Sequence, residues 1–435
     1  MIGGIHPEYN KLTADSKIVT APAPKKVVLP LQQHIGAPCE PRVNVGDIVR
    51  SGQKIAEGKG FVSAPIHSSI TGKVTAIGSA RHPVLGEFNA ITIEVVPGLE
   101  LTEPEKKLRN PEDLNKDELK AIIKDAGIVG LGGAAFPTHV KLSPPPEKKI
   151  DTLIINGAEC EPYLTCDHRI MIEEPEKILK GLKVIMKILE PINVYIGIED
   201  NKDDALIVMQ LKLKELGLGG KVKIAKMQTV YPQGSEKNLI QSITKREVPN
   251  AGGLPMDVGV VVQNVQTVKA IYDAVYEGKP LIERVVTITG AVKEPKNILV
   301  KIGTNAKELI DFCGGYDGAV GKVISGGPMM GIAQPDDNMP VIKGSSGVLV
   351  QLEDKTSVAE RDCIRCGRCV DVCPVKLMPT MIYQYTRKED YDGANDYFAM
   401  DCFECGSCSF ICPSKIPLTH WVKVAKSELM KRKKK

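Results

Sequence analysis

Two runs of the sequence repeat one cysteine pattern, and they read Cys363-Ile-Arg-Cys366-Gly-Arg-Cys369-Val-Asp-Val-Cys373-Pro374 and Cys402-Phe-Glu-Cys405-Gly-Ser-Cys408-Ser-Phe-Ile-Cys412-Pro413. In each run three thiols are separated by two residues, and a fourth follows after three more, directly before a proline. Three thiols at this spacing converge on a four-iron cubane from a tight loop. The fourth is carried away by the next helix and, in two-cluster proteins, ligates the other cluster. The pattern therefore predicts two [4Fe–4S] clusters.

The spacing also predicts how the eight thiols divide between the clusters. We expect cluster I to be held by Cys363, Cys366, Cys369 and Cys412, and cluster II by Cys402, Cys405, Cys408 and Cys373. The alternative is a pair of zinc sites, but those usually show two Cys-x2-Cys pairs without a following proline. The 28 residues between the runs, 374–401, have a largely helical pattern. The segment 353–435 is therefore predicted to be an α-helical ferredoxin domain.

The composition sets limits on the rest of the chain. Its 435 residues are 43% apolar and 25% charged, which is typical of a globular protein of about three domains. The net charge of +4 comes from the last five residues, Lys431–Lys435, which are all basic, and the remainder carries −1. Nucleic-acid binding is therefore not expected. We expect this tail to be solvated and disordered, and the alternative is a contact with anionic lipid.

The same residues indicate where the chain works. No run of ~18 apolar residues predicts a membrane span, and the N-terminus lacks the pattern of a signal peptide. A reducing, cytoplasmic location follows, in which clustered cysteines bind metals more often than they form disulfides.

A glycine-rich stretch, 127–141, precedes a series of apolar strands. A helix is predicted at 115–127, with Asn115 and Glu118 as a capping box. Strands are then predicted at 151–156, 192–198, 222–225 and 258–263, with helices at 175–189 and 202–216. This alternation predicts an α/β layered domain, in which polar groups at the ends of strands form ligand sites.

Four segments in this domain resemble the NADH-oxidising flavoprotein subunit of respiratory complex I. They are Gly130-Leu-Gly132-Gly133-Ala-Ala-Phe136-Pro137-Thr138-x-x-Lys141, Asn156-x-x-Glu159-x-Glu161-Pro162, Tyr231-x-x-Gly234-x-Glu236, and Gln263-Asn264-Val265-x-Thr267.

The resemblance implies one FMN and a site for NAD(H). Backbone at Gly130, Gly132 and Gly133 would hold FMN, and Lys141 would face its phosphate or an electron-rich edge of the flavin. Asn156 and Asn264 would be polar anchors. Phe136, Glu161 and Glu236 match positions that line the dinucleotide site. The other residues predicted to bind a cofactor are Glu159, Tyr231, Gly234, Gln263 and Thr267.

The chain departs from that family at several positions, among them Leu131, Ala158, Cys160, Ser235 and Gln263. Some polar contacts to flavin or dinucleotide must therefore differ. No catalytic side chain is expected, because hydride transfer is the chemistry of the cofactors themselves.

Two β modules flank the predicted flavin domain. The pattern Val43-x-x-Gly46-Asp47, continued through 72–74, resembles a lipoyl-like β sandwich, and residues 285–334 resemble a soluble-ligand-binding β-grasp module. We therefore predict a multidomain α/β plus β protein. Its domains are a barrel sandwich at 1–105, an FMN/NAD-binding α/β domain at 106–282, a β-grasp domain at 283–352 and a double-cluster domain at 353–435.

The whole chain resembles the C subunit of the Rnf complex, through the order of these domains and through short segments such as residues 3–7, 33–38 and 325–331. The resemblance implies a membrane-bound ferredoxin:NAD⁺ oxidoreductase coupled to Na⁺ or H⁺ translocation. It also implies integral membrane partners, a ferredoxin-accepting iron–sulfur partner and a peripheral place on the cytoplasmic face. Two alternatives remain open: an NADH-dependent corrin reductase of a microcompartment, and a non-enzymatic iron–sulfur relay.

Overall fold

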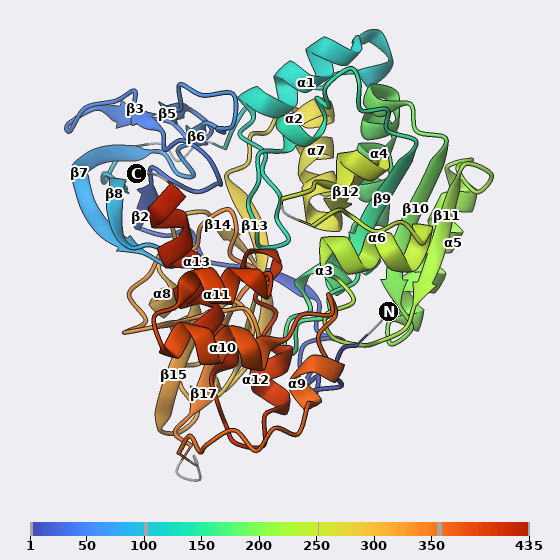
Figure 1. Cartoon of the computed structure of the whole chain (residues 1–435). Helices are drawn as coiled ribbons and strands as arrows, with labels where there is room; N and C mark the ends of the chain where they lie inside the picture. The colour runs from blue at the N-terminus through green and yellow to red at the C-terminus, as the bar shows by residue number, and fades with distance from the viewer. Residues whose placement is uncertain (1–2, 100–102, 251, 355–358, 434–435) are drawn as a thin grey trace.

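The computed structural model describes residues 3–99, 103–250, 252–354 and 359–433. Figure 1 shows a β-rich N-terminal module and a parallel sheet on opposite sides of the molecule, with a second sheet and the C-terminal helices between and below them. Among the described residues, no helix is both long and apolar enough to cross a membrane.

The N-terminal module is a barrel sandwich of two small antiparallel sheets. One sheet has the order β2-β8-β7-β4 and the other β3-β5-β6. Buried and more exposed residues alternate along part of each long strand, as at 72–75 and 91–94, which is typical of sheets with one face against a core. The strands are β2 (Lys26–Pro30), β3 (Glu40–Pro41), β4 (Ile48–Val49), β5 (Lys54–Glu57), β6 (Ile66–His67), β7 (Gly72–His82) and β8 (Gly86–Glu94).

The second module is a three-layer α/β domain with a parallel sheet of order β11-β10-β9-β12. Leu153 and Ile155 of β9 pack with α1, α4, α5 and α7, whereas Ile154 packs with α6 on the other face. Both faces of β9 are covered and this strand is largely apolar, whereas the edge strand β11 carries the exposed Lys223 and Lys226. The elements are α1 (Lys116–Asp125), α2 (Thr138–Lys141), β9 (Thr152–Gly157), α3 (Cys166–Glu173), α4 (Pro175–Leu189), β10 (Asn193–Glu199), α5 (Asp203–Glu215), β11 (Val222–Met227), α6 (Glu236–Thr244), β12 (Val260–Asn264) and α7 (Val265–Glu277), with the 3-10 turns η1 (Pro111–Asp113) and η2 (Pro255–Val258).

The third module is a mixed sheet of order β1-β14-β13-β17-β15-β16, with one helix against it. Its first strand comes from the beginning of the chain. The elements are β1 (Ile18–Thr20), β13 (Glu283–Gly290), β14 (Lys296–Lys301), α8 (Ala306–Phe312), β15 (Val320–Ser325), β16 (Ile332–Gln334) and β17 (Gly347–Leu352).

The fourth module is helical and contains both cysteine runs. Its core is formed by α10, α11 and α13, and each cysteine run continues into a short helix, α9 or α12. The elements are α9 (Arg368–Asp371), α10 (Pro379–Arg387), α11 (Tyr391–Asp396), η3 (Ala399–Asp401), α12 (Ser407–Ile411) and α13 (Leu418–Lys433).

One expectation for this module was wrong. The basic residues 431–433 are not a disordered tail, because α13 continues through them to Lys433. Arg432 forms an ion pair with Asp392 at 3.0 Å, which helps to hold the end of the helix against α11. Lys434 and Lys435 lie outside the described residues.

Residues 3–20, which we call the N-terminal arm, bind to three modules in turn. The backbone N–H of Gly4 donates to Val372 O at 2.9 Å, and Ile5 pairs in both directions with Tyr231. Further along, β1 lies parallel to β14. The arm therefore connects the helical, α/β and β-grasp modules.

Candidate functional site

The parallel sheet has a switch in strand order between β9 and β12. From β9 the chain proceeds through β10 to β11 on one side and then returns to place β12 on the other side of β9. Asn264 ends β12, Asn156 is the last residue but one of β9, and the two lie opposite each other in register. Open α/β sheets bind ligands at the carboxyl ends of strands at such a point.

The glycine-rich loop lies over this point. Gly127, with φ +68°, ends the turn after α1. The loop then closes on itself, because the N–H of Gly130 donates to Phe136 O at 2.8 Å and that of Ala135 donates to Gly130 O at 3.1 Å. A side chain at Gly132 would meet Asn264 Cβ at 3.3 Å, so glycine lets the loop approach the strand end closely.

A cavity of about 960 Å³ opens between the loop and the strand ends. Every residue predicted to bind a cofactor lines it except Thr267, whose hydroxyl accepts the Leu131 N–H at 2.8 Å and so fixes the loop from behind. Two side-chain atoms at its wall, Ser235 Oγ and Gln263 Nε2, have no hydrogen-bond partner among the described residues. Donors left unpaired at a cavity wall suit a ligand with several acceptors, as FMN is.

Hydrogen bonds and one ion pair fix the polar side chains around the strand ends. Asn156 Nδ2 donates to Gly234 O at 2.8 Å, and its Oδ1 accepts the Ala158 N–H at 3.0 Å. Lys141, which was expected to face phosphate or flavin, has its ammonium 2.5 Å from Glu236. Lys141 and Glu236 thus form one charged pair at the wall of the cavity.

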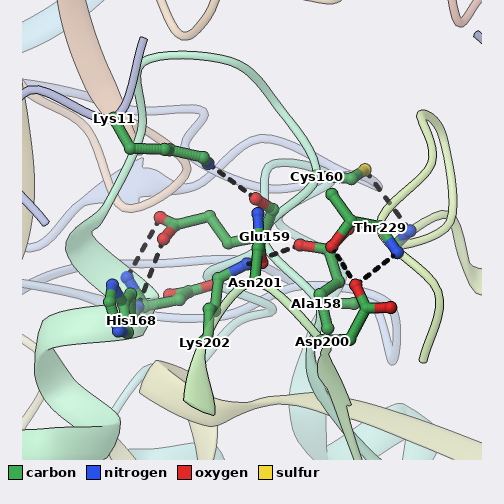
Figure 2. Close-up of polar contacts among 12 residues, drawn as sticks. Lys11, Ala158, Glu159, Cys160, His168, Asp200, Asn201, Lys202 and Thr229 are labelled. Carbon is green, nitrogen blue, oxygen red and sulfur yellow. Dashed lines mark hydrogen bonds and ion pairs between the residues drawn. The ribbon is translucent and has the colours of Figure 1, made fainter. Parts of the chain in front are cut away.

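Glu159 lies beneath the cavity with its carboxylate at the N-terminus of α3. Its two oxygens accept the N–H groups of Asp167 and His168 at 3.0 and 3.2 Å, where the helix dipole favours a negative charge (Figure 2). Asp167 in turn accepts from Asn264 Nδ2 at 2.6 Å. Burial and the neighbouring Glu159 raise the pKa of Asp167 to about 7.

Lys11 of the N-terminal arm holds the loop that carries these carboxylates. Its ammonium donates to three backbone carbonyls, Glu159 O at 2.7 Å, Glu161 O at 2.9 Å and Leu164 O at 2.6 Å. Figure 2 shows this side chain pointing down onto the Glu159 backbone. Burial lowers the pKa of Lys11.

Glu161 and Tyr231 connect the cavity with the other two modules. A Glu161 oxygen accepts the N–H groups of Met329 and Met330 at 2.6 and 3.0 Å, and both belong to the β-grasp loop after β15. The Tyr231 hydroxyl donates to Cys405 O at 2.6 Å. Tyr231 is completely buried, so a single side chain spans from the wall of the cavity to a cluster II residue.

The eight cysteines form two groups in the helical module. Cys373 of the first run lies with Cys402, Cys405 and Cys408 of the second around one small apolar cavity. Cys363, Cys369 and Cys412 gather in another cluster of side chains, and Cys366 is exposed beside them.

The group of Cys373, Cys402, Cys405 and Cys408 suits a metal cluster, because four thiols line one small apolar cavity. Burial raises the pKa of the Cys402 thiol to about 12 and that of Cys408 to about 11. Buried thiols of this kind keep their protons until a metal displaces them. The residues present therefore suit the [4Fe–4S] group that their spacing predicts.

Several residues at the site were not found from the sequence. Lys11 comes from the N-terminal arm, Phe403 from the second cysteine run, and Val84 from the β7–β8 turn of the barrel sandwich. Lys11 and Val84 stand in no recognisable motif, and only their arrangement in space reveals them. Phe403 lies inside the second cysteine run, where its one distinguishing feature is that it replaces the Ile364 of the first run.

Four family descriptions match successive parts of the chain. They are the RnfC barrel sandwich hybrid domain at 1–96, the Nuo51 FMN-binding domain at 123–273, the SLBB domain at 285–333 and the 4Fe-4S dicluster domain at 355–413. The predicted fold class and the predicted cofactors, FMN and [4Fe–4S] clusters, are thereby confirmed.

Curated relatives match over almost the whole length. The C subunit of the proton-translocating ferredoxin:NAD(+) oxidoreductase complex of Clostridium ljungdahlii is 51% identical over 91% of this chain and 86% of its own. The C subunit of the Na(+)-translocating complex of Acetobacterium woodii is 45% identical, with 100% and 98% covered.

Among solved structures, an NAD+-reducing [NiFe]-hydrogenase chain in the H2-reduced state has a TM-score of 0.52 at 17% identity. The match covers 74% of this chain and 62% of that one, and indicates a shared fold. The curated relatives identify the family and confirm the resemblance found in the sequence. This chain belongs to the family of C subunits of Rnf-type, ion-translocating ferredoxin:NAD⁺ oxidoreductase complexes.

Proposed function

We propose that this chain is the NAD-reactive subunit of a ferredoxin:NAD⁺ oxidoreductase complex coupled to the translocation of Na⁺ or H⁺. The observation that supports it most is the contact between the flavin-type cavity and cluster II, made by Tyr231 through its 2.6 Å hydrogen bond to Cys405 O. A cavity for a two-electron cofactor thus adjoins a site for a one-electron cofactor.

The residues have separate tasks in this proposal. FMN, when bound, supplies the exchange between single electrons from the clusters and the hydride of NAD(H). The backbone of Gly130, Gly132 and Gly133 and the side chains of Asn156 and Asn264 would hold it. The other predicted cofactor-binding residues would shape the cavity for FMN and the dinucleotide, and they are Phe136, Lys141, Glu159, Glu161, Tyr231, Gly234, Glu236, Gln263 and Thr267.

The eight cysteines complete the path. Cys363, Cys366, Cys369 and Cys412 would hold cluster I, and Cys402, Cys405, Cys408 and Cys373 would hold cluster II. Cluster II would be the nearer to FMN, because Cys405 is the ligand whose backbone touches the wall of the cavity.

The partners in this proposal follow from the family. They are integral membrane subunits, which would move the ion, and an iron–sulfur subunit that accepts electrons from ferredoxin. The chain would lie peripherally on the cytoplasmic face of the membrane. The domain limits 1–105, 106–282, 283–352 and 353–435 belong to the same proposal.

Anaerobic purification of the full chain tests the proposal. We expect about eight irons and eight sulfides per chain from the two motifs, together with one FMN, and NADH-dependent reduction of ferricyanide. A protein with iron but without flavin and without this activity would be an electron relay, and the proposal would be wrong.

A further inference from the structure

The two cysteine runs fold alike, which allows a comparison within one chain. Arg365 and Glu404, which occupy the same place in the two loops, have φ values of +56° and +62°. Gly367 and Gly406, two residues on, have φ values of +77° and +84°. A short helix, α9 or α12, begins directly after each glycine. Equivalent positions therefore present equivalent faces.

In the second run this face is docked against the flavin-binding side of the molecule. Phe403 lines the cavity, and Ser407 is completely buried. A side chain at Gly406 would meet Met329 O at 3.0 Å, so the loop backbone lies directly on the β-grasp loop. Glu404 is neutralised within its own module by Lys426 at 2.6 Å. The loop around cluster II is thus an interface between two redox sites.

In the first run the same face points into solvent. Ile364, the counterpart of Phe403, is 67% exposed, and Cys366 is exposed where Cys405 is buried. A side chain at Gly367 would meet nothing within 4 Å. Arg365 and Arg368 are exposed on either side of Cys366.

The two arginines on this face are not neutralised by an ion pair within the described part of the chain, although Glu360, Asp362 and Asp371 stand close to them in the sequence. Among the described residues, neither Arg365 nor Arg368 has a side-chain hydrogen bond or ion pair with a carboxylate. The two acidic residues just before the loop, Glu360 and Asp362, lie in the field of Arg387, whose pKa is raised first by the Tyr383 hydroxyl and then by these two carboxylates.

We propose that the loop 364–368 is the docking face for a protein that carries single electrons and has an acidic surface around its redox centre. Ile364 would be the apolar centre of the contact, as Phe403 is in the docked copy. Arg365 and Arg368 would bind carboxylates of the partner, since guanidinium groups pair with them bidentately.

The electron step is simple, and it rests on the proposed function. The carrier loses one electron and cluster I gains it, without a bond or a proton changing hands, and in the reverse direction the roles are exchanged. Cluster II, whose predicted ligands Cys373, Cys405 and Cys408 are buried, would then pass the electron on to FMN, and the electron would enter the chain near the exposed Cys366.

The test uses the full chain, purified anaerobically with its clusters and FMN. An acidic bacterial ferredoxin with two [4Fe–4S] clusters is the probe, and it stands in for the iron–sulfur partner that would deliver single electrons to this chain in the complex. Reduced ferredoxin is mixed with the chain and NAD⁺, and NADH formation is followed at several salt concentrations. Binding of oxidised ferredoxin to the chain is measured separately by surface plasmon resonance, which needs no turnover.

Charge reversal in Arg365→Glu/Arg368→Glu should lower the rate constant with ferredoxin about tenfold at low salt and abolish most of its salt dependence. Binding should weaken by a similar factor. The matched control, Lys221→Glu/Lys223→Glu, reverses two exposed charges beside and on β11 and should change both readouts less than twofold. If the glutamate variant loses iron, Arg365→Gln/Arg368→Gln replaces it, and its expected loss is about threefold.

The outcomes separate this proposal from the one on which it rests. NADH–ferricyanide activity and FMN content, which report the flavin site, and iron content, which reports the clusters, should be the same in all variants used. If they are absent from the parent chain, the proposed function fails. If they are normal and reversal at Arg365 and Arg368 leaves ferredoxin binding and turnover unchanged, the docking face is wrong. It is equally wrong if the normal parent neither binds nor oxidises ferredoxin.

Discussion

Replacing Lys11 by methionine should weaken FMN binding without removing a residue that lines the cavity. Methionine has about the same length as lysine but cannot donate, so the three carbonyls at 2.6–2.9 Å lose their partner. Each hydrogen bond from a charged donor contributes ~1.5–3 kcal/mol, and the three together have an upper limit of ~9 kcal/mol. These values are already net of desolvation, but three bonds that share one ammonium do not add in full.

A net loss of ~3 kcal/mol remains, which corresponds to ~100-fold in the equilibrium between the ordered and the loosened loop. We therefore expect the Kd of the apoprotein for FMN to rise by up to ~100-fold in Lys11→Met. Quenching of flavin fluorescence during titration measures it. The matched control is Lys17→Met, in the same arm, where the side chain is exposed.

The iron content serves as the check on folding, because the clusters lie in another module. If Lys11→Met binds FMN within threefold of both the parent and Lys17→Met, the three hydrogen bonds do not organise the loop. The N-terminal arm would then have no part in shaping the flavin site, and the reasoning would be refuted.

Three further changes probe other parts of the molecule. Cys405→Ser should lower iron from about eight to about four per chain while FMN is retained, and loss of both clusters would mean that the helical module needs both to fold. Gly234→Ala should abolish FMN retention, because its Cβ would overlap Ala158 O, whereas Gly220→Ala, with no atom within 4 Å, should retain it. Burial raises the pKa of Glu283, but two lysine ammonium groups at 2.5 and 3.1 Å outweigh it and lower that pKa to about 2. This carboxylate therefore stabilises the fold above the unfolded pKa of ~4.3 and loses its effect as pH falls towards 2, so Glu283→Gln should lower the melting temperature at pH 7 and not at pH 2.

The modules and the cysteine groups could be predicted because their determinants are local. Three thiols at fixed spacing, a capping box at Asn115 and alternating apolar strands each act within a few residues. The strands predicted at 151–156 and 192–198 occur within one residue of their observed limits, as β9 and β10. The helix α7 was missed, although Asn264 caps it through Gln266 and Thr267.

The contacts between modules could not be predicted in this way. Lys11 lies 148 residues from its first partner, and Tyr231 lies 174 residues from Cys405. Nothing in the residues around Lys11 distinguishes it from an exposed lysine, since its environment is created by chain that is distant in sequence. The helical structure of 431–433 was missed for a similar reason. A basic run alone predicts a solvated tail, and the ion pair of Arg432 with Asp392 depends on a residue that is distant in sequence.

The N-terminal arm has a consequence for how the protein is made. Its partners Tyr231, Asn297 and Val372 leave the ribosome long after it does, and the contact between Asn297 and Thr13 spans 284 residues. During synthesis the arm therefore lacks these three partners while the barrel sandwich and the parallel sheet begin to fold. We expect the arm to be the last segment to reach its native structure, because its contacts can form only after all four modules have been synthesised.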